Sequence, residues 1–176
     1  MKKILLSLFM IAGLSYVASA QTEGAVQKLS IGAEFGLPTK SNSDNLIIGG
    51  SLQYEHPVAK ALSLTGSAGY LSNMVTGATR DALKLINAKT SSGIVPLKAG
   101  AKYYFGGNFY AAGEVGAAIG TQTGSTTLLA LAPTLGASFS VADKSSLDFG
   151  LRYENWSGNG GSTGFMGLRA AYAFGL

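Results

Sequence analysis

The feature that most constrains this chain is an alternation of apolar residues with small or polar ones, which recurs through eight segments. Near the start of the first, Leu29, Ile31 and Phe35 alternate with Ser30 and Glu34. A two-residue period places successive side chains on opposite faces of an extended strand. Each segment is long enough to cross a hydrocarbon layer as a tilted strand, which takes about 9–11 residues. The segments are residues 28–37, 46–56, 62–72, 94–105, 108–120, 128–141, 146–156 and 164–176.

Charged residues fall on one side of this alternation. In residues 94–105, 108–120, 146–156 and 164–176, no charged residue shares the face that carries the large apolar ones. The opposite face is mostly glycine, serine, alanine and threonine. A soluble sandwich or barrel would need an abundantly charged outer face, whereas this chain has 12% charged and 47% hydrophobic residues. We therefore expect an apolar outer wall around a narrow polar interior.

Eight charged residues are predicted to project into that interior. Four are positive and four negative, and an eight-stranded barrel is only just wide enough for its own side chains. The balance favours a closed interior in which the charges neutralise one another, since unpaired buried charge is costly; a polar pathway or gate is the functional alternative. The residues are Glu34, Lys98, Lys102, Glu114, Asp148, Arg152, Glu154 and Arg169.

The N-terminus has the three parts of a secretory signal peptide. Lys2 and Lys3 precede an apolar stretch over residues 4–17, and Ala18-Ser19-Ala20 provides a small-residue cleavage site. We therefore expect residues 1–20 to be cleaved and residues 21–176 to form a single barrel domain.

Connector lengths alternate between long and short, as in outer-membrane barrels with external loops and periplasmic turns. The longest connector contains residues 79–89, which predict either a short amphipathic helix that contacts lipid headgroups or a partner protein, or a simple packed loop. Pro133 lies inside a predicted strand and, lacking an N–H donor, is expected at a bulge or a strand rim. The long connectors are residues 38–45, 73–93, 121–127 and 157–163, and the short ones are 57–61, 106–107 and 142–145.

The chemistry of common active sites is poorly represented. The chain contains no cysteine, and His56 is its only histidine. A single base beside Pro57 at a short turn is expected to be an interfacial residue. Neither clustered histidines nor an acidic calcium loop is present, so we expect no catalytic residues, metal or cofactor. Without residues 1–20, the net charge is too small to predict nucleic-acid binding.

Several of these features resemble the small outer-membrane β-barrel proteins of Gram-negative bacteria, the group of OmpX and the membrane domain of OmpA. They are the signal peptide, the alternating segments, Val95-Pro96-Leu97 followed by Tyr103-Tyr104-Phe105, and the C-terminal Ala171-Tyr172-Ala173-Phe174-Gly175-Leu176. The resemblance implies an all-β, eight-stranded, antiparallel up-and-down transmembrane barrel. It also implies that Tyr172, Phe174 and Leu176 form the signal for the barrel-assembly machinery, although this chain ends in Leu176 where the family has phenylalanine.

We therefore expect a non-enzymatic integral protein of the Gram-negative outer membrane, exported through its signal peptide. Its lumen should be closed or nearly closed, and its external loops should provide surface contacts or envelope integrity. Expected partners are outer-membrane lipid and, during insertion, the barrel-assembly machinery. Three alternatives stay open: an accessory barrel of a larger outer-membrane assembly or secretion complex, which would bind another outer-membrane protein; a narrow pore; and a lipid-modifying enzyme.

Overall fold

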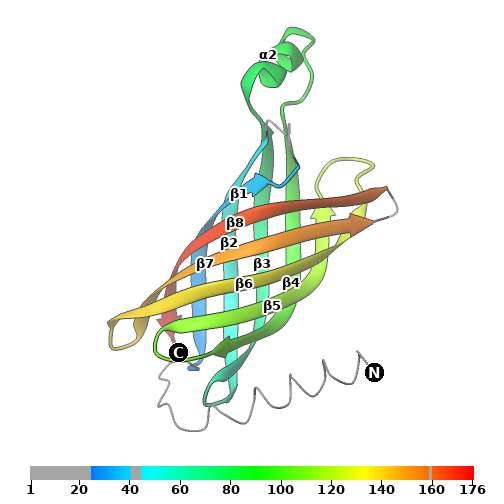
Figure 1. Cartoon of the computed structure of the whole chain (residues 1–176). Coiled ribbons are helices and arrows are strands. Elements are labelled where there is room, and N and C mark those ends of the chain that lie inside the picture. The colour runs from blue at the N-terminus through cyan, green and yellow to red at the C-terminus, as the bar shows by residue number, and fades with distance from the viewer. Residues whose placement is uncertain (1–24, 41–44, 159) are drawn as a thin grey trace.

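The computed structural model describes residues 25–40, 45–158 and 160–176, which form one closed β-barrel (Figure 1). Eight antiparallel strands pair in sequence order, and the first closes the barrel by pairing with the last. This confirms the predicted fold class. The predicted signal peptide, residues 1–20, lies outside the described residues. The elements are β1 (Lys28–Pro38), β2 (Asn45–Ala59), β3 (Leu62–Val75), α2 (Gly77–Leu85), β4 (Ser91–Tyr104), β5 (Phe109–Gly120), β6 (Thr127–Ala142), β7 (Ser145–Gly158) and β8 (Gly161–Gly175).

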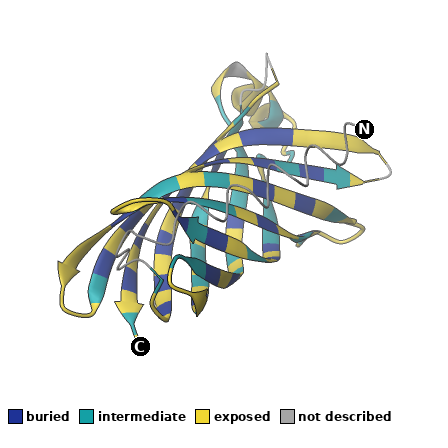
Figure 2. Cartoon of the chain, turned by 60° about the horizontal axis from the view of Figure 1, so that its bottom comes forward, coloured by how far each residue is buried: buried dark blue, intermediate teal, exposed yellow. Residues whose placement is uncertain are grey.

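The predicted alternation appears as an alternation of burial. In β1, side chains from Lys28 to Leu37 are buried and exposed in turn, and β7 follows the same pattern from Ser146 to Glu154. Figure 2 shows the resulting dark blue and yellow bands along the strands. Since neighbouring residues of a strand point to opposite faces, one set lines the interior and the other forms the outer wall.

The outer wall is apolar. Ile31, Leu135 and Leu168 are 57%, 62% and 55% exposed, and every charged residue within the eight strands is buried. An apolar surface this extensive is unsuited to water but matches the hydrocarbon of a bilayer, in which a closed barrel leaves no unpaired strand edge. Among the described residues, no helix is long and apolar enough to cross a membrane.

The two ends of the barrel have different connectors. At one, the short-turn end, Lys60 and Ala61 join β2 to β3, and Asp143 and Lys144 join β6 to β7. The C-terminus lies at this end (Figure 1). At the other, the α2 end, helix α2 stands beyond the strands between β3 and β4. The segment 79–89, for which helix and packed loop were both open, is therefore partly helical.

The prediction of a long connector over residues 157–163 is wrong. Strands β7 and β8 continue to pair through Ser157 with Ser162 and Gly158 with Gly161. Gly161 has φ of 121°, a backbone conformation that glycine adopts without steric cost. Glycine and serine suggest a loop by composition, but here cross-strand pairing extends the ladder into a tight hairpin.

Pro133 is accommodated by neither a bulge nor a strand rim, contrary to expectation. It lies inside β6 and pairs with Gly113 of β5. Toward β7, pairing stops after Leu131 and resumes at Thr134 in the same register. Because proline has no N–H to donate, a gap in one ladder is sufficient, and the strand does not shift.

Glycine permits a close approach between β4 and β5. A Cβ atom on Gly100 would overlap the carbonyl oxygen of Gly113, and one on Gly116 would overlap that of Leu97. Gly100 and Gly116 belong to the inward-facing set of their strands, so their small size allows the backbones to pack tightly around a narrow interior.

Candidate functional site

The candidate site is the barrel interior, which strand alternation fills with charged side chains. The structure places all eight residues of the predicted set there, each no more than 7% exposed. It adds Lys28 and Glu55, which were not in that set and are 8% and 3% exposed. Parity along the strand could have found both, because Lys28 shares a face of β1 with Glu34, and Glu55 shares a face of β2 with Gln53. The interior therefore holds five positive and five negative side chains.

Nine of these ten side chains form one continuous series of ion pairs in which negative and positive groups alternate. We call this series the charge chain. The tenth, Lys28, has its ammonium nitrogen 5.8 Å from the centre of the Tyr104 ring. The order along the charge chain is Glu55, Lys102, Asp148, Arg169, Glu34, Arg152, Glu154, Lys98 and Glu114.

The charge chain begins around Lys102, near the short-turn end. The Lys102 ammonium lies 2.7 Å from Glu55 Oε1 and 2.6 Å from Asp148 Oδ2. Its nitrogen is also 3.9 Å from the centre of the Tyr110 ring. The Tyr104 hydroxyl donates to Glu55 at 2.9 Å, and the Tyr110 hydroxyl donates to Asp148 at 2.7 Å. These contacts satisfy both carboxylates and hold two aromatic rings across the interior.

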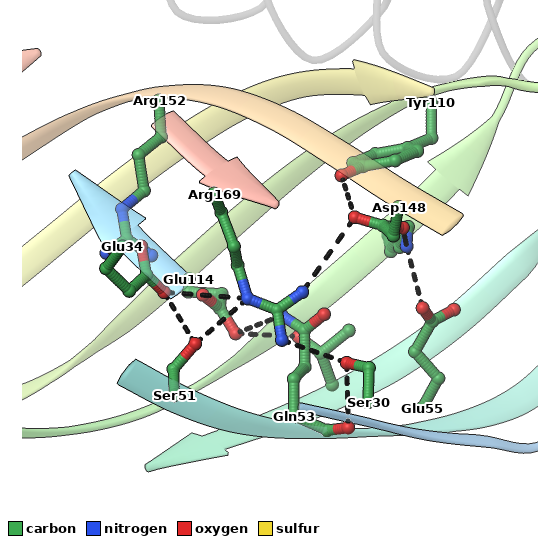
Figure 3. Close-up of polar contacts among 12 residues, drawn as sticks. Ser30, Glu34, Ser51, Gln53, Glu55, Tyr110, Glu114, Asp148, Arg152 and Arg169 are labelled. Atoms are coloured by element: carbon green, nitrogen blue, oxygen red, sulfur yellow. Dashed lines mark hydrogen bonds and ion pairs between the residues drawn. The ribbon is translucent and has the colours of Figure 1, made fainter. Parts of the chain in front are cut away.

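Arg169 connects this region to the rest of the charge chain, as Figure 3 shows. Its guanidinium lies 3.8 Å from Asp148 on one side and 3.5 Å from Glu34 on the other. It also donates to the hydroxyls of Ser51 and Ser30, both at 2.9 Å. Arginine suits this position because its planar group presents several donors in different directions.

The second half of the charge chain crosses the interior from β1 to β5. Arg152 lies 2.8 Å from Glu34 and 3.0 Å from Glu154. Lys98 lies 2.8 Å from Glu154 and 3.9 Å from Glu114. Because each buried charge faces at least one of opposite sign, the arrangement offsets the desolvation that would otherwise expel these groups.

An apolar cluster closes the interior toward the α2 end. Ile47, Leu71, Trp156 and Phe165 are each no more than 4% exposed and pack together. The rings of Trp156 and Phe165 meet edge to face, with centres 4.9 Å apart. Trp156 also donates its indole N–H to Glu154 at 2.8 Å. We call this cluster the apolar cap. The sequence pattern did not predict this cluster, although Trp156 and Phe165 fall on the inward parity of their strands.

The space left between these groups is very small. A cavity of about 10 Å³ lies among Glu34, Pro96, Lys98, Arg152 and their neighbours. This is close to the least volume that holds a single water molecule, about 10–15 Å³. Larger hollows lie elsewhere, including one of about 690 Å³ on the outer wall over β1, β2 and β3, and one of about 450 Å³ at the short-turn end, lined by Lys28, Ser146 and Leu176 among others. Between the short-turn mouth and the α2 end, the charge chain and the apolar cap of the described residues thus leave little space.

Candidate catalytic groups are not brought together. His56 lies exposed in β2 near the short-turn end, with its ring stacked 6.3 Å from that of Tyr54. Within the described ranges, no group of three or more histidine, aspartate or glutamate residues is arranged to hold a metal ion. Each interior carboxylate is engaged by a lysine or arginine of the charge chain.

The residues predicted as the assembly signal lie at the end of the chain. Tyr172 and Phe174 project from β8 onto the outer wall, with ring centres 4.8 Å apart. Leu176 is 66% exposed, and its backbone N–H donates to the carbonyl of Gln27 at 3.0 Å. The three side chains therefore face outward near the short-turn end, where an interfacial girdle of aromatic residues belongs.

No protein-family profile matches this sequence, and no curated protein matches it. Solved structures do match. Neisserial surface protein A has a TM-score of 0.62 with 16% identity over 85% of this chain and 97% of its own. The chain has the fold of the small eight-stranded outer-membrane β-barrels. This confirms the resemblance found in the sequence.

Two other solved barrels match over a similar share of this chain. Ail, the attachment invasion locus protein of Yersinia pestis, has a TM-score of 0.56 with 18% identity over 86% of this chain and 99% of its own. OprG from Pseudomonas aeruginosa has a TM-score of 0.55 with 13% identity over 90% and 99%. Ail has also been crystallised with the heparin analogue sucrose octasulfate. At these identities the outer-membrane barrels share the fold with this chain.

Proposed function

We propose that this protein is a closed, non-enzymatic barrel of the Gram-negative outer membrane, which provides surface contacts or envelope integrity through the loops at its α2 end. The observation that carries the proposal is the filled interior. A conducting path would have to break ion pairs of the charge chain and separate the rings of the apolar cap. Among the described residues there is neither a catalytic pair nor a metal site that would support a different role.

The location follows from the same features. The uncharged outer wall suits outer-membrane lipid, and residues 1–20 have the composition of an export signal. Exposed Tyr172 and Phe174 on β8, followed by Leu176, support recognition by the barrel-assembly machinery during insertion. With an even number of strands, both ends of the barrel domain lie on one side of the membrane, and we assign the short-turn end to the periplasm.

Electrical recording tests the closed interior. The refolded protein should give no stable single-channel conductance in planar bilayers. A variant that combines Trp156→Ala, Phe165→Ala and Arg169→Ala serves as the positive control, because it removes the apolar cap and the centre of the charge chain together. Slower or faster gel migration of unboiled relative to boiled samples reports that each variant is folded. Reproducible conductance of the unaltered protein would overturn the proposal and favour the narrow pore.

Surface contact is supported by basic residues at the α2 end. Arg80, Lys84 and Lys89 are exposed there, against a single acidic residue, Asp81, in the same connector. Ail, whose name refers to attachment and which binds a sulfated heparin analogue, has the same fold.

Crosslinking in native membranes tests the accessory-subunit alternative: a specific adduct with a second outer-membrane protein would favour a larger assembly over a solitary barrel.

A further inference from the structure

The end of helix α2 and its C-cap residue carry the most exposed large apolar side chains that the structure describes. Leu85 is 85% exposed and Ile86 is 72% exposed, more than any such side chain on the lipid-facing wall. Leu83, by contrast, is half-buried. Exposed apolar residues at the tip of a loop carry a solvation cost unless another surface covers them. The helix thus presents an apolar face that nothing within the described chain covers.

The helix is amphipathic in a way that separates apolar from basic residues. At 100° per residue, Leu85 and Ile86 fall beside Ala82, which precedes them by three and four positions. Arg80 and Lys84 are four positions apart and project from the opposite side. An apolar face opposite a basic one is the pattern of helices that lie in a membrane interface.

The charges of α2 are unbalanced, unlike those of the interior. Arg80 and Lys84 on the helix and Lys89 after it face only one acidic residue in this connector, Asp81. None of the three takes part in an ion pair within the described residues. The surface that complements this helix therefore combines an apolar layer for Leu85 and Ile86 with negative charges for the basic residues. A leaflet of phosphate-bearing lipid has both.

We propose that α2 docks on the outer leaflet of the membrane that its own barrel crosses, with Leu85 and Ile86 inserted among the lipids and Arg80 and Lys84 beside their phosphates. This inference rests on the proposed function, of which it names the contacted surface. The contacted surface is lipid and not a soluble polyanion, a second copy of the chain or another protein.

The connection to the barrel favours this surface. Val75 N–H donates to the carbonyl of Thr90 at 2.9 Å, which closes the base of the connector directly above the ends of β3 and β4. Lipid-facing Tyr70 is only five residues before that base. A nine-residue helix is about 13 Å long and would bind a free partner weakly, but tethering makes membrane contact intramolecular and raises its effective concentration.

Both ends of α2 provide the turns that docking needs. Gly77, at the start, has φ of 63°, and Asn87, just after the end, has φ of 53°. These left-handed conformations end the helical path of the backbone at the two sides of α2. The orientation of the helix is therefore set at two defined turns and is not a continuation of β3 or β4.

Single-cysteine labelling tests the docking, because the chain contains no cysteine of its own. Leu85→Cys and, as the matched control on the opposite side of the helix, Arg80→Cys are labelled with an environment-sensitive fluorophore. Each is reconstituted in phosphatidylcholine vesicles and in vesicles that also contain anionic phosphatidylglycerol, with iodide on both sides. We expect the Leu85 label in anionic vesicles to be shielded from iodide and quenched by spin-labelled lipids, and the Arg80 label to stay accessible.

Removing the basic residues tests the electrostatic part. In the Leu85→Cys background, Lys84→Gln and Lys89→Gln should each reduce the preference for anionic vesicles about fivefold, because a basic residue near an anionic surface contributes about 1 kcal/mol. Lys60→Gln, at the short-turn end, should leave it unchanged. Equal iodide access at positions 80 and 85 in anionic vesicles would overturn the inference.

The other occupants predict different results. Shielding that requires added heparin would assign α2 to a soluble polyanion, and shielding that rises with protein density in the vesicles would assign it to a second copy. Either result would overturn lipid docking. The same proteoliposomes are recorded for conductance: a conducting barrel with a shielded Leu85 label contradicts only the closed interior, whereas a silent barrel with an accessible label contradicts only the docking.

Discussion

The two halves of the barrel interior are closed by opposite chemistries. Toward the short-turn end, Lys102 is held between Glu55 and Asp148 at 2.7 and 2.6 Å. Toward the α2 end, the apolar cap packs Trp156 against Phe165 with ring centres 4.9 Å apart. Ion pairs depend on every partner being present, whereas an apolar cluster depends on shape and volume. A narrow barrel can therefore exclude water by either means, but the two closures should fail differently.

Loss of one charge should have the largest effect. Lys102→Met leaves Glu55 and Asp148 without their shared cation, and breaking a buried pair in this way costs about 3–5 kcal/mol. Denaturant unfolding, followed by the fluorescence of Trp156, measures the loss. Lys60→Met in the exposed turn is the control and should change stability little. Equal stability of the two variants would mean that the interior charges contribute nothing to the fold.

A cavity in the apolar cap should cost less than a lost cation. Leu71 is 1% exposed, and Leu71→Ala should lower the free energy of unfolding by about 2–3 kcal/mol, within the range for buried leucine truncations. We expect no conductance from this variant in planar bilayers, because the charge chain still closes the interior toward the short-turn end. Conductance would show that the apolar cap is the sole barrier.

A hydroxyl that supports the charge chain should have a smaller effect. Tyr110→Phe keeps the ring over Lys102 but removes the 2.7 Å hydrogen bond to Asp148. The expected loss is about 1.5 kcal/mol, at the low end for a hydrogen bond to a charged group. Tyr70→Phe, whose exposed ring lies on the outer wall and whose hydroxyl makes no hydrogen bond among the described residues, is a matched control in the same unfolding experiment. A loss as large as that of Lys102→Met would contradict the assignment of the ammonium as the dominant contact.

The smallest effect on stability is expected outside the barrel. Leu85 is 85% exposed, so Leu85→Ser should change the free energy of unfolding in detergent by less than about 0.5 kcal/mol. In anionic vesicles the same substitution should weaken docking of α2. A large loss of stability in detergent would indicate that Leu85 packs against the barrel.

Much of the barrel could be predicted because strand geometry is local. In β7, the alternation with apolar residues predicted an inward face for Asp148, Arg152 and Glu154, and these three side chains are buried. Glu55 was not included, although it shares a face of β2 with Gln53 and is 3% exposed. The hairpin through Gly158 and Gly161 was misjudged because composition does not reveal whether serine and glycine residues pair across strands.

The apolar cap could not be predicted for a different reason. The alternation places Trp156 and Phe165 on the inward face, but it does not say whether inward apolar residues of strands far apart in the sequence meet. Ile47 of β2 and Leu71 of β3 join them only because the barrel closes. Their contact depends on strand register and on the small residues around them.

The sequence by itself determined which side chains face lipid and which face the interior, since a two-residue period is a property of each strand alone. Only the tertiary structure decided which charges meet. Arg169 of β8 lies between Glu34 of β1 and Asp148 of β7 because closure brings the first and last strands together and the stagger of the strands sets the height of each residue. Alternating signs in the charge chain are therefore a consequence of barrel closure, which no single strand encodes.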